Sequence, residues 1–284
     1  GLTLGQKDYY VDADSETAKV REAYVAYIQK LAAHVGFSQD DAARMAQDVM
    51  RIETRLAKAS RSMTELRDPE ANYNKMSYEQ LKKDFPGIKW DAYFQNFGIS
   101  GLKEVIVGQP EAIHEVERIL AEETPEALQN VYLWHAINMA SGYVDDESRN
   151  IAFSFWGTTL SGRTQDRPRW KRAVSSVDGF LGEALGQLYV AKYFPPAAKE
   201  RMVKLVANLQ QALGERIDVQ DWMTPETKKV AREKLDAFYV KVGYPDKWAD
   251  YSSLEIGHSY LQNVLACQAW SLKDQIAKHL NKPV

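Results

Sequence analysis

Apolar residues recur at gaps of three and four along nearly every periodic stretch of this chain. That spacing places apolar side chains on one face of an α-helix, whereas a half-buried strand needs strict alternation. In the segment 151–194, two helical patterns flank a polar hinge at 161–168. The second pattern predicts one buried stripe, formed by Trp170, Val174, Val177, Leu181, Leu185 and Leu188. The sequence therefore predicts a mainly α fold with long packed helices, short connections and this helix near its centre.

Two glycines, Gly182 and Gly186, lie four residues apart beside the predicted stripe. In an exposed helix each would cost roughly 0.5–1 kcal/mol relative to alanine. Their position therefore predicts that another backbone approaches this helix closely.

Helix start signals recur along the chain at Asp14, Ser38, Thr124, Asp145 and Thr224. The side-chain oxygens of these residues can accept hydrogen bonds from the free backbone N–H groups of a first helical turn. Thr124 and Thr224 are each followed by Pro-Glu, which adds a first-turn proline and an early acid. Each signal therefore predicts the beginning of a helix.

The start signals and the apolar spacing together predict the remaining elements. Helices are expected over residues 14–36, 38–68, 77–84, 90–97, 110–123, 124–139, 196–213, 224–238 and about 254–280. Within 196–213, a stripe typical of a packed helix consists of Met202, Leu205, Val206, Leu209 and Leu213. The short apolar run 103–107 could be extended, and residues 243–246 form a turn pattern. No repeat of fixed period and no low-complexity segment interrupts this order.

Length and charge exclude several classes of protein. A folded chain of 284 residues buries about 75% of the surface that its unfolded form exposes, so one core can form without disulfides or metal. No run of about 18 apolar residues is present to cross a membrane. The net charge is −3, with 36 basic and 39 acidic residues interspersed, which gives no electrostatic case for nucleic-acid binding. The single cysteine, Cys267, lies on an apolar helical pattern and is predicted to be a core residue.

The histidines do not form a metal-binding motif. A zinc peptidase helix of the His-Glu-x-x-His type needs two histidines one turn apart, so that both imidazoles reach one ion. The chain has His34, His114, His135, His258 and His279, and no two are four apart. Arg118 occupies the second ligand position after His114-Glu115, and a guanidinium cannot donate a lone pair to zinc. The glycine in Glu255-Ile256-Gly257-His258 likewise predicts a turn or a helix start, so no residue is assigned to a metal site.

Two charged groups have alternative interpretations. The basic cluster Arg163, Arg167, Arg169, Lys171 and Arg172 could brace the hinge through Asp166, Asp178 and Glu183, or could hold peptide carboxylates in a cavity. The pair Asp145-Asp146 is predicted to cap a helix and not to act as paired catalytic acids. Helical spacing favours core packing for Trp134, Phe153, Phe155 and Trp156. No catalytic residue is predicted, and substrate-binding residues stay unassigned.

Four motifs carry a family resemblance: TLSGRTQDRPRWKR, VDGFLGEALGQLYVAKYFPPAAKERM, DWMTPETKKVAREKL and VGYPDKWADYSSLEI. Together they resemble the neprilysin family of zinc metallopeptidases, which includes neprilysin, endothelin-converting enzyme and the bacterial oligopeptidase O enzymes. The likeness runs from GLTLGQKDYY to LNKPV and places the chain in the helical, non-catalytic N-terminal region, truncated at both ends. The resemblance predicts residues 1–284 to be one helical domain without the catalytic zinc domain.

The resemblance implies two largely helical domains that face each other across a closed cavity, with zinc in the C-terminal domain. Its Asn-Ala-Tyr/Phe and His-Glu-x-x-His motifs have no matching positions here, so no catalytic or zinc-binding residue is transferred to this chain. The first hypothesis is a size-selecting lid of a zinc endopeptidase that hydrolyses small peptides. The missing catalytic domain would be its partner, and the fragment alone would bind no zinc and be inactive.

Two other functions stay open at this stage. A free-standing helical binding module would keep the covering fold without a protease, and reading the gene past residue 284 distinguishes it from a lid. A hydrolase that uses Asp/Glu pairs has no constellation to indicate it. Gly1 in place of an initiator methionine predicts that the chain was cut or processed. A periplasmic or secreted location is favoured for a bacterial protein, with the cytoplasm as the alternative.

Overall fold

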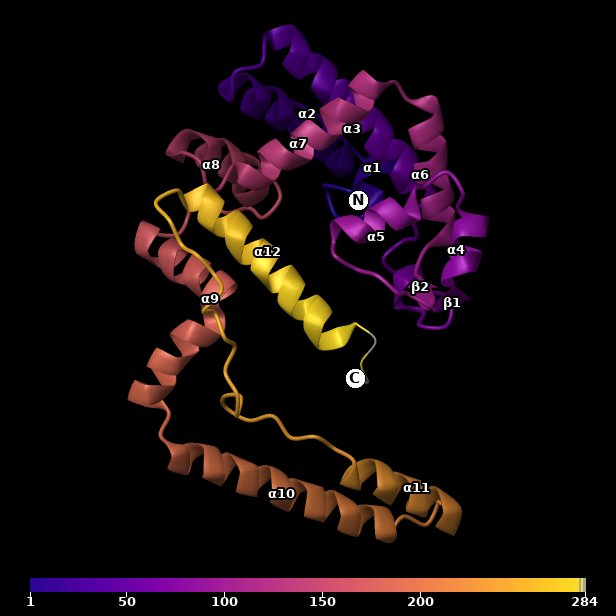
Figure 1. Ribbon diagram of the computed structural model, residues 1–284, viewed down its shortest axis with the longest axis vertical. Coiled ribbons are helices and arrows are strands. Elements are labelled where there is room, and N and C mark those ends of the chain that lie inside the picture. Colours follow the sequence, from indigo (N-terminus) through magenta and orange to yellow (C-terminus); the bar gives the residue numbers. More distant parts are fainter. Residues whose placement is uncertain (281, 283–284) are drawn as a thin grey trace. The chain divides into compact units, whose positions relative to one another are not determined.

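The computed structural model describes residues 1–280 and 282, so the last residues of the predicted domain 1–284 lie outside the described part. The fold is mainly helical, as predicted, and its only described sheet has two strands (Figure 1). The chain divides into two compact units. The first comprises Gly1–Arg167 together with Ile256–Val284, and the second comprises Pro168–Glu255.

Three long helices form the centre of the first unit: α2 (Ser15–His34), α3 (Gln39–Ala59) and α7 (Pro125–Ala140). Helix α3 packs against both α2 and α7, and the short helix α1 (Asp8–Val11) contacts α2 and α3 (Figure 1). The predicted start signals are confirmed here. Asp14 accepts from the backbone N–H groups of Glu16 and Thr17 at 2.9 and 3.0 Å, and Ser38 accepts from that of Asp41 at 3.1 Å.

The apolar faces of these helices build the main core. Tyr24, Ile28 and Leu31 of α2 are buried, as the spacing predicts. The face of α3 is buried through Met45, Val49 and Ile52. However, α3 ends at Ala59 and not at Asp68-Pro69, so Met63 lies beyond the helix and is exposed.

A small subdomain of the first unit surrounds the hairpin of β1 (Asn74–Ser77) and β2 (Glu104–Val107), which pair antiparallel. Helices α4 (Tyr78–Asp84) and α5 (Trp90–Asn96) lie between the strands in sequence, after the 3-10 turn Glu65–Arg67. Leu81, Phe85 and Val107 form its buried cluster. Helix α6 (Pro110–Glu122) follows β2 and packs on α3. The extended alternative for 103–107 is thus confirmed.

Three further elements complete the first unit. Helix α8 (Asp146–Ala152) leads into a seven-residue π-helix, η2 (Phe153–Thr159), which the apolar spacing did not predict. Helix α12 (Tyr260–His279) begins six residues later than expected, and Ser259 caps it. Cys267 of α12 is buried, and burial raises the pKa of its thiol, in agreement with a core role. Among the described residues, no helix is both long and apolar enough to span a bilayer.

The second unit contains three helices: α9 (Arg169–Tyr193), α10 (Pro196–Asp218) and α11 (Pro225–Asp236). Helices α10 and α11 lie side by side as a hairpin (Figure 1). Pro195-Pro196 separates α9 from α10. Thr224 caps α11 through the backbone N–H of Thr227, as predicted. The described core of this unit is small, since its buried apolar side chains are Ile217 and Leu235.

The prediction of a buried central helix is wrong for α9. No residue of α9 is buried, and Leu181, with φ −132° and ψ 35°, breaks its helical geometry. The predicted close backbone approach is also not found, because Gly186 faces the Trp248 ring and Gly182 has only Asp178 of its own helix nearby. Four of the five predicted stripe residues of α10 are likewise exposed, namely Met202, Leu205, Leu209 and Leu213, and Val206 is half-buried. Periodicity identifies an apolar face, but it does not say whether that face is covered.

Candidate functional site

The family resemblance makes zinc the first group to test against the described residues. No cluster of three or more histidine, cysteine, aspartate or glutamate side chains that could hold a metal ion is found in residues 1–280 and 282. His114 lies on the surface of α6 beside Glu117, and Arg118 pairs with Glu115. His258 precedes α12, where the N–H of Gly257 donates to Asn263. These residues do not fit a zinc site, so no catalytic step through zinc is assigned to them.

A network of side-chain hydrogen bonds is instead centred on a buried carboxylate, Glu53 of α3. Its Oε1 accepts from the hydroxyl of Thr3 at 2.5 Å, and its Oε2 accepts from Tyr10 at 2.6 Å and Tyr24 at 3.1 Å. His135 Nε2 lies 3.2 Å from Oε1. The carboxylate thus joins the N-terminal segment to three helices inside the first unit.

Hydrogen bonds extend this network to the aromatic core. The indole N–H of Trp134 donates to the Tyr24 hydroxyl at 2.8 Å, and the backbone N–H of Leu4 donates to the Tyr10 hydroxyl at 3.0 Å. Among the described residues, no buried side-chain nitrogen or oxygen lacks a partner. A satisfied buried network of this kind holds its members in one arrangement.

Burial keeps the two phenols of the network protonated. Burial, followed by the charge of Glu53, raises the pKa of Tyr10 and of Tyr24 far above the ordinary phenol value. Both hydroxyls therefore remain donors to the carboxylate at any physiological pH. The hydroxyls of Thr3, Tyr10 and Tyr24 all bond to the Glu53 carboxylate, and this arrangement supports a structural role. Sequence reasoning did not single out Glu53, because its partners lie far away along the chain.

A second polar contact involves Asp145, which caps α8. Its Oδ1 accepts from the backbone N–H of Ser148 at 2.7 Å and lies 3.2 Å from His34 Nε2. The Ser148 backbone bond, then the Ser148 hydroxyl and His34, lower the pKa of Asp145 from 3.8 to about 2. The predicted helix cap is therefore confirmed.

The Asp145 cap is expected to make stability depend on acidity in a defined window. Because the folded pKa lies below the unfolded one, its contribution is present above pH 3.8 and is lost as pH falls through about 2. In urea unfolding measured across this range, Asp145→Asn should lower the midpoint above pH 3.8 and approach the unsubstituted chain near pH 2. Ser148→Ala removes the hydroxyl donor that helps to lower the pKa of Asp145, so the loss of stability should begin at a higher pH. A difference that does not change with pH would contradict this assignment.

The basic cluster near the hinge is divided between several contacts. Asp166 pairs with Arg149 of α8 at 3.0 Å, and the Arg163 guanidinium lies 5.2 Å from the centre of the Phe153 ring. Within the second unit, Glu183 accepts from the backbone N–H of Ala249 at 2.5 Å, and Lys171 lies over the Trp170 ring. Asp166 and Glu183, two of the carboxylates expected to brace the hinge, therefore bond to Arg149 and to a backbone N–H.

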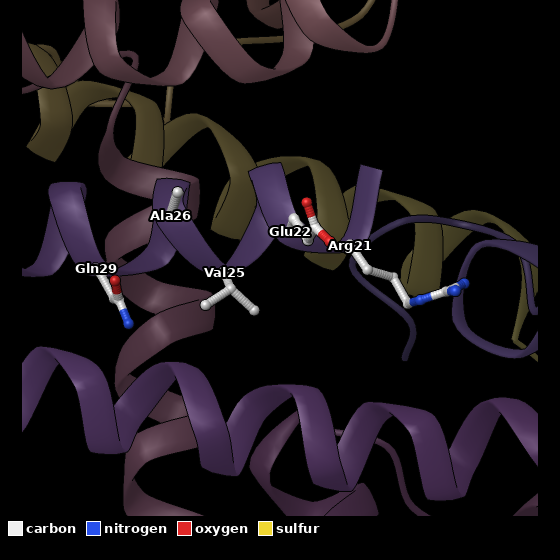
Figure 2. A pocket seen from close by; sticks show the side chains of 5 residues that line it. All are labelled: Arg21, Glu22, Val25, Ala26 and Gln29. Atoms are coloured by element: carbon white, nitrogen blue, oxygen red, sulfur yellow. The ribbon is translucent and has the colours of Figure 1, made fainter. Parts of the chain in front are cut away.

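Two hollows mark the surface of the first unit. One has a volume of about 430 Å³ and is lined by side chains of a single helix, α2, as Figure 2 shows: Arg21, Glu22, Val25, Ala26 and Gln29. Arg21 is already engaged, since it donates to the Tyr9 carbonyl at 2.9 Å. This hollow contains neither a buried polar group nor a set of convergent donors.

The second hollow, of about 680 Å³, runs between the α4–α5 connection and α6 and is acidic. Its carboxylates are already paired: Glu117 accepts from the Gly87 N–H at 2.6 Å, and Glu111 and Glu122 pair with Arg61 and Arg55. These contacts anchor α6 to its neighbours, and Asp84, a fourth carboxylate of the lining, accepts from the amide of Gln80.

Comparison with known proteins identifies the family of this chain, which the geometry of the described residues alone does not. The sequence model described as peptidase family M13 matches residues 1–245, which is most of the chain. This chain belongs to peptidase family M13. The resemblance to neprilysin-like zinc metallopeptidases is thereby confirmed, and the chain is the N-terminal region of such a protein.

The relatives agree in sequence and in fold. Endothelin-converting enzyme 1 of Rattus norvegicus is 26% identical over 99% of this chain and 39% of its own length. Zinc metalloprotease Zmp1 of Mycobacterium tuberculosis, in its open state, is 35% identical with a TM-score of 0.89, over 100% of this chain and 44% of Zmp1. PepO from a Lactobacillus is 21% identical with a TM-score of 0.85 over 96% of this chain, and at this identity the likeness shows the fold alone. The chain thus spans less than half the length of the M13 proteins that it matches.

Proposed function

We propose that this chain is the size-selecting, non-catalytic N-terminal part of a zinc-dependent endopeptidase that hydrolyses peptide bonds in small peptides. The observation that carries the proposal is the match to Zmp1, which covers this whole chain but only 44% of a protein named a zinc metalloprotease. In this proposal, the remaining polypeptide of the peptidase binds the zinc and supplies the catalytic groups.

The geometry of the first unit supports a role as a rigid cover that limits access to a catalytic centre. Its long helices are fixed by a continuous aromatic and aliphatic core, by the Glu53 network and by the ion pairs of Arg55 with Glu115 and Glu123 at 2.9 and 2.8 Å. A close-packed helical domain keeps its shape. If it covers a catalytic centre, short peptides can enter the space beneath it, but folded proteins are too large to do so. None of these contacts requires a metal ion or a substrate.

The first test asks whether catalysis lies outside these residues. Purified residues 1–284 are expected to contain no stoichiometric zinc by elemental analysis and to cleave no peptide. The gene beyond residue 284 is expected to encode Asn-Ala-Tyr/Phe followed by His-Glu-x-x-His. One tightly held zinc per chain would contradict the proposal, and a stop codon after residue 284 would favour the free-standing binding module.

The second test addresses size selection in the full-length protein. Cleavage should be measured for a ladder of peptides of increasing length that share one cleavable sequence, and for the same sequence placed in a loop of a folded protein. The proposal expects kcat/KM to fall sharply beyond a limiting length and the folded protein to resist cleavage. Equal cleavage of the peptides and of the folded protein would show that these residues do not select by size.

A further inference from the structure

Helix α10 has an apolar face that no described residue of the second unit covers. Met202, Leu205, Leu209 and Leu213 follow one another at gaps of three and four, and between 42% and 61% of each side chain is exposed. We name these four residues the α10 stripe. Residues on the opposite side of the helix, such as Lys204, Gln211 and Glu215, are polar. The helix is therefore amphipathic, but its apolar side faces solvent.

The packing partner of α10 within its own unit contacts the C-terminal part of the helix. Gly214 and Ile217 are buried where α10 meets α11, and Gly214 leaves room for the Arg232 guanidinium. Arg232 in turn pairs with Asp218. Ile217 follows Leu213 at a gap of four, so α11 covers the continuation of the apolar face, while the four residues of the α10 stripe stay exposed.

The second unit is poorly stabilised by its own core. Ile217 and Leu235 are its buried apolar side chains among the described residues, while Trp170, Val174 and Val177 of α9 are exposed as well. A soluble domain of this size normally buries about 60–70% of the surface that its unfolded chain exposes. Contiguous exposed apolar surface of this kind marks an interaction site. This unit therefore requires a partner surface.

The family comparison indicates what that partner is. The family match at residues 1–245 includes the whole of α10 and α11, so these helices belong to the common fold of the family. In the relatives the same region is embedded in a polypeptide more than twice as long, since this chain covers 39% of the rat enzyme and 44% of Zmp1. The additional polypeptide of the peptidase is thus available to cover an apolar helix face.

We propose that the α10 stripe is the docking face for the zinc-binding part of the peptidase. The second unit then belongs structurally with the catalytic part, and the covering role falls to the first unit, which has a complete core of its own. This inference rests on the proposed function, because it takes the chain to be the N-terminal region of a longer zinc peptidase.

Cysteine labelling of the full-length protein tests the docking face. Leu209→Cys places a thiol in the α10 stripe, and Gln211→Cys places one on the opposite side of the same helix. The rate at which a bulky maleimide labels each variant is divided by the labelling rate of the same variant in denaturing urea. The unsubstituted protein gives the background labelling of the buried Cys267. Leu209→Cys is expected to react slower than Gln211→Cys by a factor on the order of 100, because labelling requires the docked surface to open.

Three other results would overturn the proposal. Equal rates at both positions in a protein that binds zinc and cleaves peptides would refute the docking face and leave the proposed function intact. Protection of Leu209→Cys that disappears on dilution, together with a dimer mass by light scattering, would assign the face to a second copy of the chain. A full-length protein without zinc and without peptide cleavage would refute the proposed function, and the docking face with it.

Discussion

Replacing Glu53 with alanine is expected to lower the free energy of unfolding of the first unit by about 3–5 kcal/mol. The substitution removes the common acceptor of the Thr3, Tyr10 and Tyr24 hydroxyls, which are held at 2.5, 2.6 and 3.1 Å. Each buried donor left without an acceptor costs about 1–3 kcal/mol, and the release of a buried charge offsets part of the sum. Urea unfolding followed by near-ultraviolet circular dichroism measures the loss.

Three variants separate the network from a general effect on α3. Glu53→Gln keeps the shape and one carbonyl acceptor, so it should cost less than alanine. Tyr10→Phe removes a single donor and should cost about 1–2 kcal/mol. Gln47→Ala changes an exposed position of the same helix and should stay within about 0.5 kcal/mol. If Glu53→Ala behaves like Gln47→Ala, the carboxylate does not hold the core together.

The same network is expected to fix the N-terminal segment. Thr3 and Tyr10 bond directly to Glu53, and Lys7 donates to the Ser60 carbonyl at 2.7 Å, so residues 3–10 are attached to α3 at Glu53 and at its C-terminal cap. Loss of the carboxylate should therefore expose the backbone of this segment before the rest of the unit unfolds. The Glu53 network thus links an apparently irregular segment to the helical wall on which the proposed size selection depends.

Local chemistry is the part of this fold that the sequence predicts well. The caps at Asp14, Ser38, Thr124, Asp145 and Thr224 all form as expected, because each needs only a side-chain oxygen and an N–H two or three residues later. The strand Asn74–Ser77 was not predicted, since Met76 is its one apolar residue and gives no alternation. Its pairing with Glu104–Val107 depends on a partner some thirty residues away.

The Glu53 network and the exposed stripes could not be read from the sequence for a related reason. The three hydroxyls that meet at Glu53 come from positions 50, 43 and 29 residues away, so no local sequence pattern predicts these contacts. An apolar stripe identifies a helix face that is suited to packing, but it does not say which surface covers that face, and that surface can be any part of the polypeptide. The stripes of α9 and α10 were therefore identified correctly as faces and placed wrongly in the core of this chain.

The family relationship was recognised from motifs that carry no chemistry of their own. The segment 159–172 contributes to the resemblance, and its described contacts include an ion pair, two cation–aromatic contacts, and hydrogen bonds of the backbone and of the Thr159 and Ser161 hydroxyls. These contacts hold the turn between η2 and α9 in place. For that reason the segment identifies the family without naming any residue that binds substrate or metal.

The second large effect is expected for Trp134→Ala, which should reduce the free energy of unfolding by about 3–5 kcal/mol. Trp134 is completely buried, packs edge-on against Tyr24 and Tyr27 with ring centres at 5.9 and 5.2 Å, and donates to the Tyr24 hydroxyl. The alanine variant leaves a large cavity between α2 and α7 that the rigid core cannot fill.

Two comparisons make the Trp134 prediction specific. Because Tyr24 bonds to both Trp134 and Glu53, the double variant Trp134→Ala/Glu53→Ala should fall short of additivity by about 0.5–3 kcal/mol. Trp170→Ala removes the same type of side chain from α9, where 64% of it is exposed, and should change the stability of residues 1–284 by no more than about 0.5 kcal/mol. Equal losses for the two tryptophans would mean that α9 is packed in this chain as the sequence first suggested. A large loss for Trp134 alone places the independent core in the first unit, and leaves the second unit to be stabilised by its partner.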